Sequence, residues 1–101
     1  MSSLASRSAP VTVRTEGGAV VLELVDALDE PTGRVLVDAV ASAVATSPER
    51  VEIDLTGLST WTDGGATSLV SCREMCRDLP EGLHYRTGRG PGRDALLAAY
   101  R

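Results

Sequence analysis

The chain has 101 residues, of which 43% are hydrophobic and 24% are charged, a profile typical of one soluble globular domain. The formal net charge is -4 and all ten cations are arginines, so the chain lacks the basic surface that nucleic-acid binding needs. No apolar run is long enough to span a membrane, and the first ten residues lack the apolar centre of a secretory signal, so we expect a cytoplasmic protein.

The N-terminal part predicts a flexible tail followed by a β-hairpin. Residues 1–10 are rich in serine and alanine and carry no periodic pattern, so we expect a frayed tail before a single domain over residues 11–101. A short strand from Val11 to Thr15, a glycine turn and a second strand from Ala19 to Val25 follow. Because the second strand is almost continuously apolar, we expect it to be central in its sheet and covered on both faces.

A helix is expected after a link that runs from Asp26 to Thr32. Asp29 or Glu30, directly before Pro31, provides a favourable helix start. Apolar residues then recur at three- and four-residue steps and predict the buried stripe of this helix: Val35, Leu36, Ala39, Val40, Ala43 and Val44. Pro48 ends the helix, because proline disfavours helical geometry in the residue before it.

The stretch from residue 51 to residue 76 organises the rest of the chain. Apolar and acidic residues alternate over residues 51–55, which predicts a buried strand, and a polar loop over residues 56–62 follows it. A helix is expected to open at Asp63, with this aspartate as its N-cap, and to run to Leu79. A helix start at the carboxyl end of a strand is a natural binding place, so we expect the working surface here.

The C-terminal part predicts a short strand from Leu83 to Arg86, a glycine-rich turn, and a last helix from Arg93 to Tyr100. The expected order is therefore β-β-α-β-α-β-α. Strands separated by helices indicate parallel neighbours with right-handed crossovers, but the pattern does not decide whether the helices cover one face of the sheet or both.

Two short motifs stand where strands are expected to meet helices. Ala27-Leu28-Asp29 closes the second strand, and VEIDLTGL over residues 51–58 forms the third strand and its end. Together with the glycine-opened helix that follows, these motifs resemble the STAS domain family, the sulfate-transporter and anti-sigma-factor-antagonist domains. The resemblance extends from Val11 to Tyr100. It implies one α/β domain with an N-terminal hairpin, parallel strands in a mixed four- to five-stranded sheet, and crossover helices packed on that sheet.

The chain departs from this family at the residue that carries the switch. In switching members the loop ends in Asp-Ser-Ser-Gly or Asp-Ser-Thr-Gly, and a partner kinase phosphorylates the hydroxyl before the glycine. An ungapped register places Thr62-Asp63-Gly64-Gly65 on these positions, so Gly64 is the acceptor equivalent. A shift by one residue puts Gly65 there instead. Neither glycine has a hydroxyl, so we expect no ordinary serine phosphorylation, and a carboxylate such as Asp63 imitates a phosphate only in part.

The resemblance and the helix start together predict a partner-binding surface. Asp29 matches the aspartate that shapes this surface in the family, although helix capping alone also explains an acid there. For Trp61, the sequence leaves two roles open, an interface anchor or a plug at the end of the core. The predicted partner-binding residues are Asp29, Thr60, Trp61, Thr62, Asp63, Gly64, Gly65, Thr67 and Ser68. The threonines and the serine among them are usually turn formers and caps, but they stay open as alternative modification sites.

No pattern in the sequence points to catalysis, to a metal or to a cofactor. Cys72 and Cys76 lie one helical turn apart, a spacing that suits buried free thiols better than a disulfide. A metal site would need two further ligands, and His84 lies on a different element. The glycine-rich run from Gly88 to Gly92 lacks the spacing and the lysine of a phosphate-binding loop.

We therefore expect a non-catalytic regulatory module that binds a protein. By resemblance, the partner is an anti-sigma factor of the serine-kinase type, and binding is constitutive. One alternative is a structural STAS subunit of a larger assembly, such as a lipid-transport ATPase complex or a stress-sensing complex. A second alternative, of another class, is a weak nucleotide-binding protein. The sequence leaves homodimer formation open.

Overall fold

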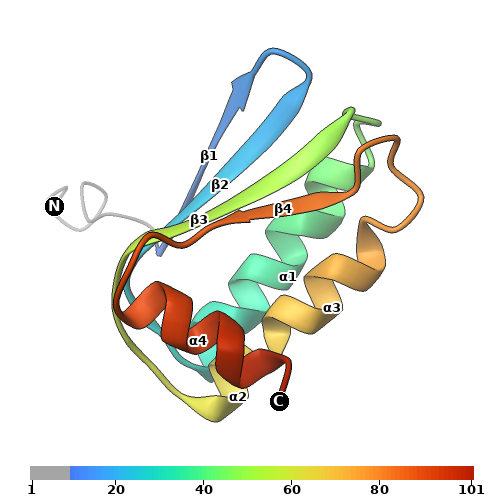
Figure 1. Ribbon diagram of the computed structural model, residues 1–101. Helices are drawn as coiled ribbons and strands as arrows, with labels where there is room; N and C mark the ends of the chain where they lie inside the picture. Colours follow the sequence, from blue (N-terminus) through green and yellow to red (C-terminus); the bar gives the residue numbers. More distant parts are fainter. Residues whose placement is uncertain (1–9) are drawn as a thin grey trace, which may run out of the picture.

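The structure is a computed structural model that describes residues 10–101, and Figure 1 shows how its strands and helices are arranged. The predicted tail lies outside the described residues except for Pro10, which is exposed. Within the described part, the elements follow one another as β1 (Val11–Glu16), β2 (Ala19–Leu28), α1 (Glu30–Val44), β3 (Arg50–Trp61), α2 (Asp63–Ala66), α3 (Ser68–Met75), β4 (Leu83–Arg86) and α4 (Pro91–Ala99).

The four strands form one mixed sheet in the order β1-β2-β3-β4. β1 and β2 are an antiparallel hairpin, joined through Gly17 at a φ of +59°, while β3 runs parallel to both β2 and β4. Glycine suits this turn because other residues rarely adopt positive φ. The predicted α/β class, the N-terminal hairpin and the parallel strands are therefore confirmed, with four strands in the described sheet.

β2 and β3 are both longer than the sequence predicts. The predicted link over residues 26–32 is wrong in its first part, because β2 continues to Leu28. The predicted polar loop over residues 56–62 is wrong as well, because β3 continues to Trp61 and buries Leu58. The two extensions pair with each other, with register shifts after Glu23 and after Asp26. These extensions contain polar residues, so a local sequence pattern does not predict them as strands. They are stabilised by hydrogen bonds to the neighbouring strand.

The helices lie on one side of the sheet (Figure 1). Their side of β2 and β3 carries the hydrophobic core, which includes Leu22, Leu24, Ile53 and Leu55 together with Leu36 of α1. β2 is central, as predicted. Its residues Ala19–Leu22 are buried on both faces, also as predicted, although the helices lie on only one side of the sheet.

Charged side chains cover the helix-free face of the sheet. Glu52 is only 6% exposed, and it pairs with Arg50 at 2.7 Å and with Arg86 at 2.6 Å. Asp54, 8% exposed, accepts hydrogen bonds from the backbone N–H of Thr56 at 2.9 Å and from its hydroxyl at 2.6 Å. The aliphatic parts of the arginines give such a face apolar cover while their charged ends stay near water.

These contacts predict a stability that depends on acid pH. The hydrogen bond from Arg50 lowers the pKa of Glu52, an effect that outweighs burial. A carboxyl group whose pKa is lower in the folded chain than in the unfolded chain stabilises the fold. This stabilisation is fully present at pH values above the pKa of the unfolded chain, about 4.3 for glutamate, and it is lost as the pH falls through the pKa of the folded chain. We expect Glu52→Gln to flatten the decline in unfolding free energy below about pH 4. Urea unfolding at a series of pH values measures this, and parallel curves for both chains would contradict it.

α1 follows its prediction in most respects. Gly33, Leu36, Val40 and Ala43 are buried along one stripe, and the helix ends at Val44, before the predicted stop. Val35 was expected in the stripe but is 43% exposed. Each helical residue turns by about 100°, and the position before Leu36 therefore points away from the sheet.

Candidate functional site

Two helix starts lie side by side because β2 and β3 are parallel neighbours. Leu28, the last residue of β2, stands opposite Trp61, the last residue of β3. The backbone N–H of Thr62 donates to the carbonyl oxygen of Leu28 at 3.0 Å and ties the two exits together. Asp29 and Thr62 follow directly. The sheet therefore brings the Ala27-Leu28-Asp29 motif and the start of the glycine-opened helix to one edge of the molecule.

Asp29 caps the first of these helices, α1. Its side chain accepts from the backbone N–H of Thr32 at 3.0 Å, in the extended conformation that an N-cap residue adopts. This hydrogen bond from Thr32 lowers the pKa of Asp29, so its carboxylate is charged at neutral pH. The sequence left Asp29 and Glu30 open as the start of this helix. In the structure Asp29 is the N-cap, and Glu30 is the first helical residue.

The cap of the second helix, α2, is Thr62, and the prediction of Asp63 as N-cap is wrong. The hydroxyl of Thr62 accepts from the backbone N–H of Gly65 at 3.0 Å. Asp63 is the first helical residue and is exposed. β3 continues to Trp61 and α2 begins at Asp63, so Thr62 is placed where the first-turn N–H groups need an acceptor. Asp63 still adds a negative charge to the positive end of the helix.

Gly64 and Gly65 have opposite environments although they are neighbours. Gly64 is exposed, and a Cβ there would meet only the flexible side chain of Glu30, at 2.5 Å from Oε2. Gly65 is buried, and a Cβ there would overlap the carbonyl group of Leu28, whose carbon would be 2.6 Å away. Gly65 is therefore needed for packing, whereas Gly64 lies on the surface.

The predicted single helix from Asp63 to Leu79 is wrong, because it is divided into α2 and α3 at Thr67. The hydroxyl of Thr67 donates to the carbonyl oxygen of Gly64 at 2.8 Å, and the hydroxyl of Ser68 donates to that of Gly65 at 2.6 Å. Side-chain hydroxyls that bond to the preceding turn compete with the helical hydrogen bonds and bend a helix.

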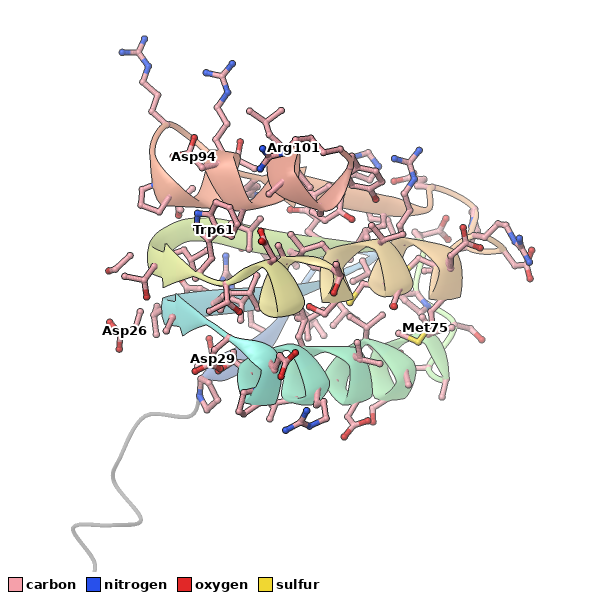
Figure 2. All side chains as sticks on the ribbon, turned by 90° about the horizontal axis from the view of Figure 1, so that it is seen from below. Asp26, Asp29, Trp61, Met75, Asp94 and Arg101 are labelled. Carbon is pink, nitrogen blue, oxygen red and sulfur yellow. The ribbon has the colours of Figure 1, made fainter. Side chains whose placement is uncertain are left out.

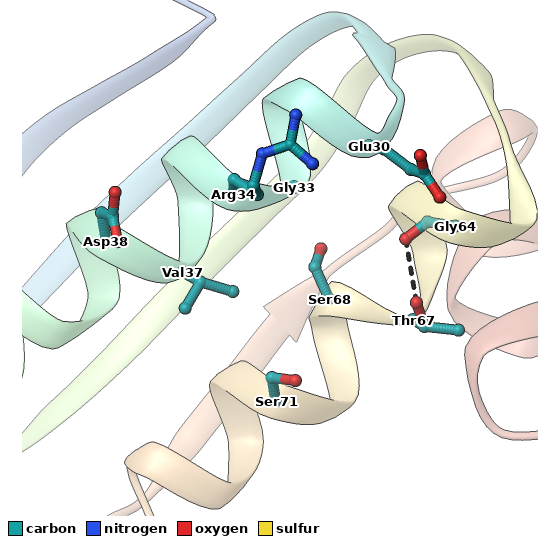
Figure 3. Close-up of a pocket in the computed structure, with 9 residues that line it drawn as sticks. All are labelled: Glu30, Gly33, Arg34, Val37, Asp38, Gly64, Thr67, Ser68 and Ser71. Carbon is teal, nitrogen blue, oxygen red and sulfur yellow. Dashed lines mark hydrogen bonds between the residues drawn. The ribbon is translucent and has the colours of Figure 1, made fainter.

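A hollow of about 470 Å³ lies between α1 and the α2–α3 pair (Figure 3). Gly33 allows the close approach of the helices at its floor, since a Cβ there would lie 3.0 Å from the hydroxyl oxygen of Ser68. α1 and the α2–α3 pair both contribute to its lining, which consists of Glu30, Gly33, Arg34, Val37, Asp38, Gly64, Thr67, Ser68 and Ser71. Figure 3 shows the carboxylate of Glu30 above Gly64.

Three of the predicted partner-binding residues line this hollow: Gly64, Thr67 and Ser68. The α1 side was missed by the sequence analysis, although a signal was present. Glu30, Arg34 and Asp38 recur every four residues, and this spacing places them on one polar face of a helix. The sequence alone does not show that this face lies opposite Gly64.

The predicted residues at the end of β3 do not line the hollow. Thr60 is exposed on β3. Trp61 is half-buried and packs against the edge of the core, while part of its side chain lines a second depression beside α4. Trp61 therefore has some of both roles that the sequence left open, since it closes the core and also contributes to the surface.

The remaining reactive residues do not form a metal-binding group in the described part of the chain. Cys72 and Cys76 are free and buried, as predicted, and burial raises the pKa of Cys72 to about 12. His84 is exposed and its ring contacts the carbonyl oxygen of Glu81 at 3.0 Å. Residues 10–101 hold no group of three or more histidine, cysteine or acidic side chains that could bind a metal ion. Among these residues, every helix is too short or too polar to cross a membrane.

The arrangement of the strands and helices defines a STAS-like fold, the fold of anti-sigma factor antagonists. A structure of an anti-sigma factor antagonist from Mycobacterium paratuberculosis matches with a TM-score of 0.71 and 25% sequence identity, over 93% of this chain and 84% of that one. The anti-sigma factor antagonist SpoIIAA in its unphosphorylated form matches with a TM-score of 0.67 and 13% identity, over 86% and 81%.

The same fold also occurs within a longer chain. The structure of Mglu matches with a TM-score of 0.70 and 17% identity over 81% of this chain, which spans only 21% of the Mglu chain. No protein-family model and no curated protein matches the sequence. The fold is therefore shared by proteins of different sizes, and a function has to be argued from the site.

Proposed function

We propose that this chain is a non-catalytic regulatory module that binds another protein through the edge formed by Asp29 and residues 62–68. The similarity to the mycobacterial anti-sigma factor antagonist, which extends over nearly the whole of both chains, supports this class. The edge joins two helix starts and a hollow, and it carries exposed polar and glycine residues that are free to meet a partner.

The partner that the resemblance favours is an anti-sigma factor of the serine-kinase type. Binding of this partner would take place in the cytoplasm. Such a partner would be held away from its sigma factor by this chain. The edge carries more acids than cations, with Asp29, Glu30 and Asp63 around a single arginine, Arg34, so we expect a partner surface with complementary positive charge.

Binding of this partner is proposed to be constitutive. The observation that carries this proposal is that Gly64, which the ungapped register equates with the acceptor, is exposed and has no oxygen for a phosphoryl group. The nearby hydroxyls of Thr62, Thr67 and Ser68 each take part in a hydrogen bond with the backbone of the α2 turn. Control then depends on the amount of the protein.

The test is to incubate the chain with candidate anti-sigma kinases and ATP and to measure its intact mass. We expect no added phosphate on the natural chain, while the partner still binds it in a pull-down. Gly64→Ser is the matched variant, and we expect it to accept one phosphate. Stoichiometric phosphate on any residue between 60 and 68 of the natural chain would refute the constitutive proposal.

A structural subunit of a larger assembly is the second candidate. The observation that favours it is the Mglu chain, in which a domain of this fold is one part of a larger protein. A pull-down separates the two candidates, since a subunit would be recovered with an ATPase or with related STAS chains. Weak nucleotide binding is the third candidate, and calorimetry without heat from ATP or GTP would exclude it.

A further inference from the structure

The outer face of α4 carries an exposed apolar side chain between two opposite charges. Leu97 is 58% exposed and lies between Asp94 and Arg101. Together with Trp61 and Tyr100, these residues line a depression of about 660 Å³. Figure 2 shows Asp94 on α4 and Arg101 at the end of the chain after this helix, and Trp61 lines the same depression. Exposed apolar side chains with a polar rim are typical of protein contacts.

The charges around this depression are self-complementary. Asp94 lies in α4 (Pro91–Ala99), Arg101 follows the end of this helix, and both line the same depression as Leu97. A second copy, related by a two-fold axis through the depression, would place each Asp94 opposite an Arg101. An isologous interface requires this kind of self-complementarity.

The depression is held in shape before any contact forms. The hydroxyl of Tyr85 donates to the carbonyl oxygen of Leu69 at 2.8 Å and lies 3.1 Å from the hydroxyl of Tyr100. The guanidinium of Arg73 lies over the Tyr100 ring, 5.8 Å from its centroid. The backbone N–H of Arg101 donates to the carbonyl oxygen of Ala98 at 3.4 Å and closes a turn after the end of α4. A fixed aromatic side chain lowers the entropy cost of association.

The two rim charges are available to a neighbour. Within residues 10–101, neither Asp94 nor Arg101 takes part in an ion pair, although five of the other arginines do or stack on an aromatic ring. An interface that supplied the missing partners would satisfy both charges at once.

We propose that a second copy of this chain binds here, related to the first by a two-fold axis that passes beside Leu97. Two ion pairs between Asp94 and Arg101 flank the apolar centre, and Trp61 and Tyr100 lie at its margin. This proposal goes beyond the regulatory function above and does not depend on it, because the dimer forms without the regulatory partner.

The test is sedimentation velocity of the full chain over concentrations up to about 1 mM. We expect a monomer–dimer equilibrium that weakens with salt, because the rim pairs are exposed. Asp94→Arg or Arg101→Asp alone is expected to weaken the dimer by at least about tenfold, since like charges then face each other. The double variant D94R/R101D exchanges the charges and is expected to restore dimerisation. Leu97→Asp is expected to abolish it.

The control is Arg89→Asp, an exposed charge outside this face, which is expected to change the dissociation constant little. Circular dichroism shows that each variant is folded. A chain that stays monomeric at every concentration would overturn the proposal. So would a dimer that Leu97→Asp leaves intact, or a double variant as weak as the single ones. A monomeric chain that loses its regulatory partner through Leu97→Asp would also overturn it, because the face then belongs to that partner.

Discussion

Gly65→Ala is expected to lower the free energy of unfolding by at least about 3 kcal/mol, a large part of the stability of a domain of this size. A Cβ on Gly65 would lie 2.6 Å from the carbonyl carbon of Leu28 and 2.9 Å from that of Asp29. Both are backbone atoms at the exit of β2. Leu28 is held by pairing to β3 and Asp29 by the first turn of α1, so neither can move without opening the sheet edge or the helix start. Urea unfolding followed by the fluorescence of Trp61 measures the loss.

The matched control for this variant is the neighbouring residue. Gly64→Ala places the same methyl group one position earlier in the same turn, where the nearest atoms belong to the side chain of Glu30. That side chain can rotate into solvent, so we expect the unfolding free energy to stay within about 1 kcal/mol of the natural chain. Equal stability of the two variants would show that β2 and α2 do not pack as closely as described.

Gly64→Trp is expected to weaken binding of the proposed anti-sigma partner by at least about tenfold while the domain stays folded. A large side chain on this exposed glycine would displace Glu30 and fill the mouth of the hollow that α1 shares with α2 and α3. Two protein surfaces pack together only where their shapes are complementary. A projecting indole ring at the centre of the interface would hold the two surfaces apart. Isothermal titration calorimetry against the purified partner measures the change.

Two comparisons separate steric from electrostatic effects in this prediction. Gly64→Ala displaces only the carboxylate of Glu30, so it shows how much that charge contributes. Ser42→Trp puts the same large ring on an exposed part of α1, in the groove beside β1 and outside the hollow, and is expected to leave affinity unchanged. Unchanged affinity in Gly64→Trp would place the interface elsewhere on the molecule.

Much of the fold could be predicted because short-range patterns report it. The alternation of Val51, Ile53 and Leu55 with acids predicts β3, and all three residues are fully buried. Gly17 predicts the hairpin turn, and Asp29 before Pro31 predicts the start of α1. In each case the cause lies within a few residues along the chain. It is the alternating direction of side chains in β3, the φ angle at the hairpin turn, and capping at the start of α1.

The candidate site was predicted in part. The sequence places Gly64 at the start of a helix, but it does not distinguish the exposed Gly64 from the buried Gly65, because the difference arises from Leu28, which is distant in sequence. It also does not place the polar face of α1 opposite that helix. The cap at Thr62 was missed since the true end of β3 depends on pairing with β2.

The sequence by itself therefore determined the class of the domain and the order of its elements, because these follow from composition and local periodicity, and the identity of residue 64 as glycine excludes a hydroxyl there. Tertiary structure decided how far β2 and β3 extend, that the helices share one side of the sheet, and which residues of α1 face α3. These features depend on hydrogen bonds and packing between segments far apart in the chain, and such contacts form only when the sheet assembles.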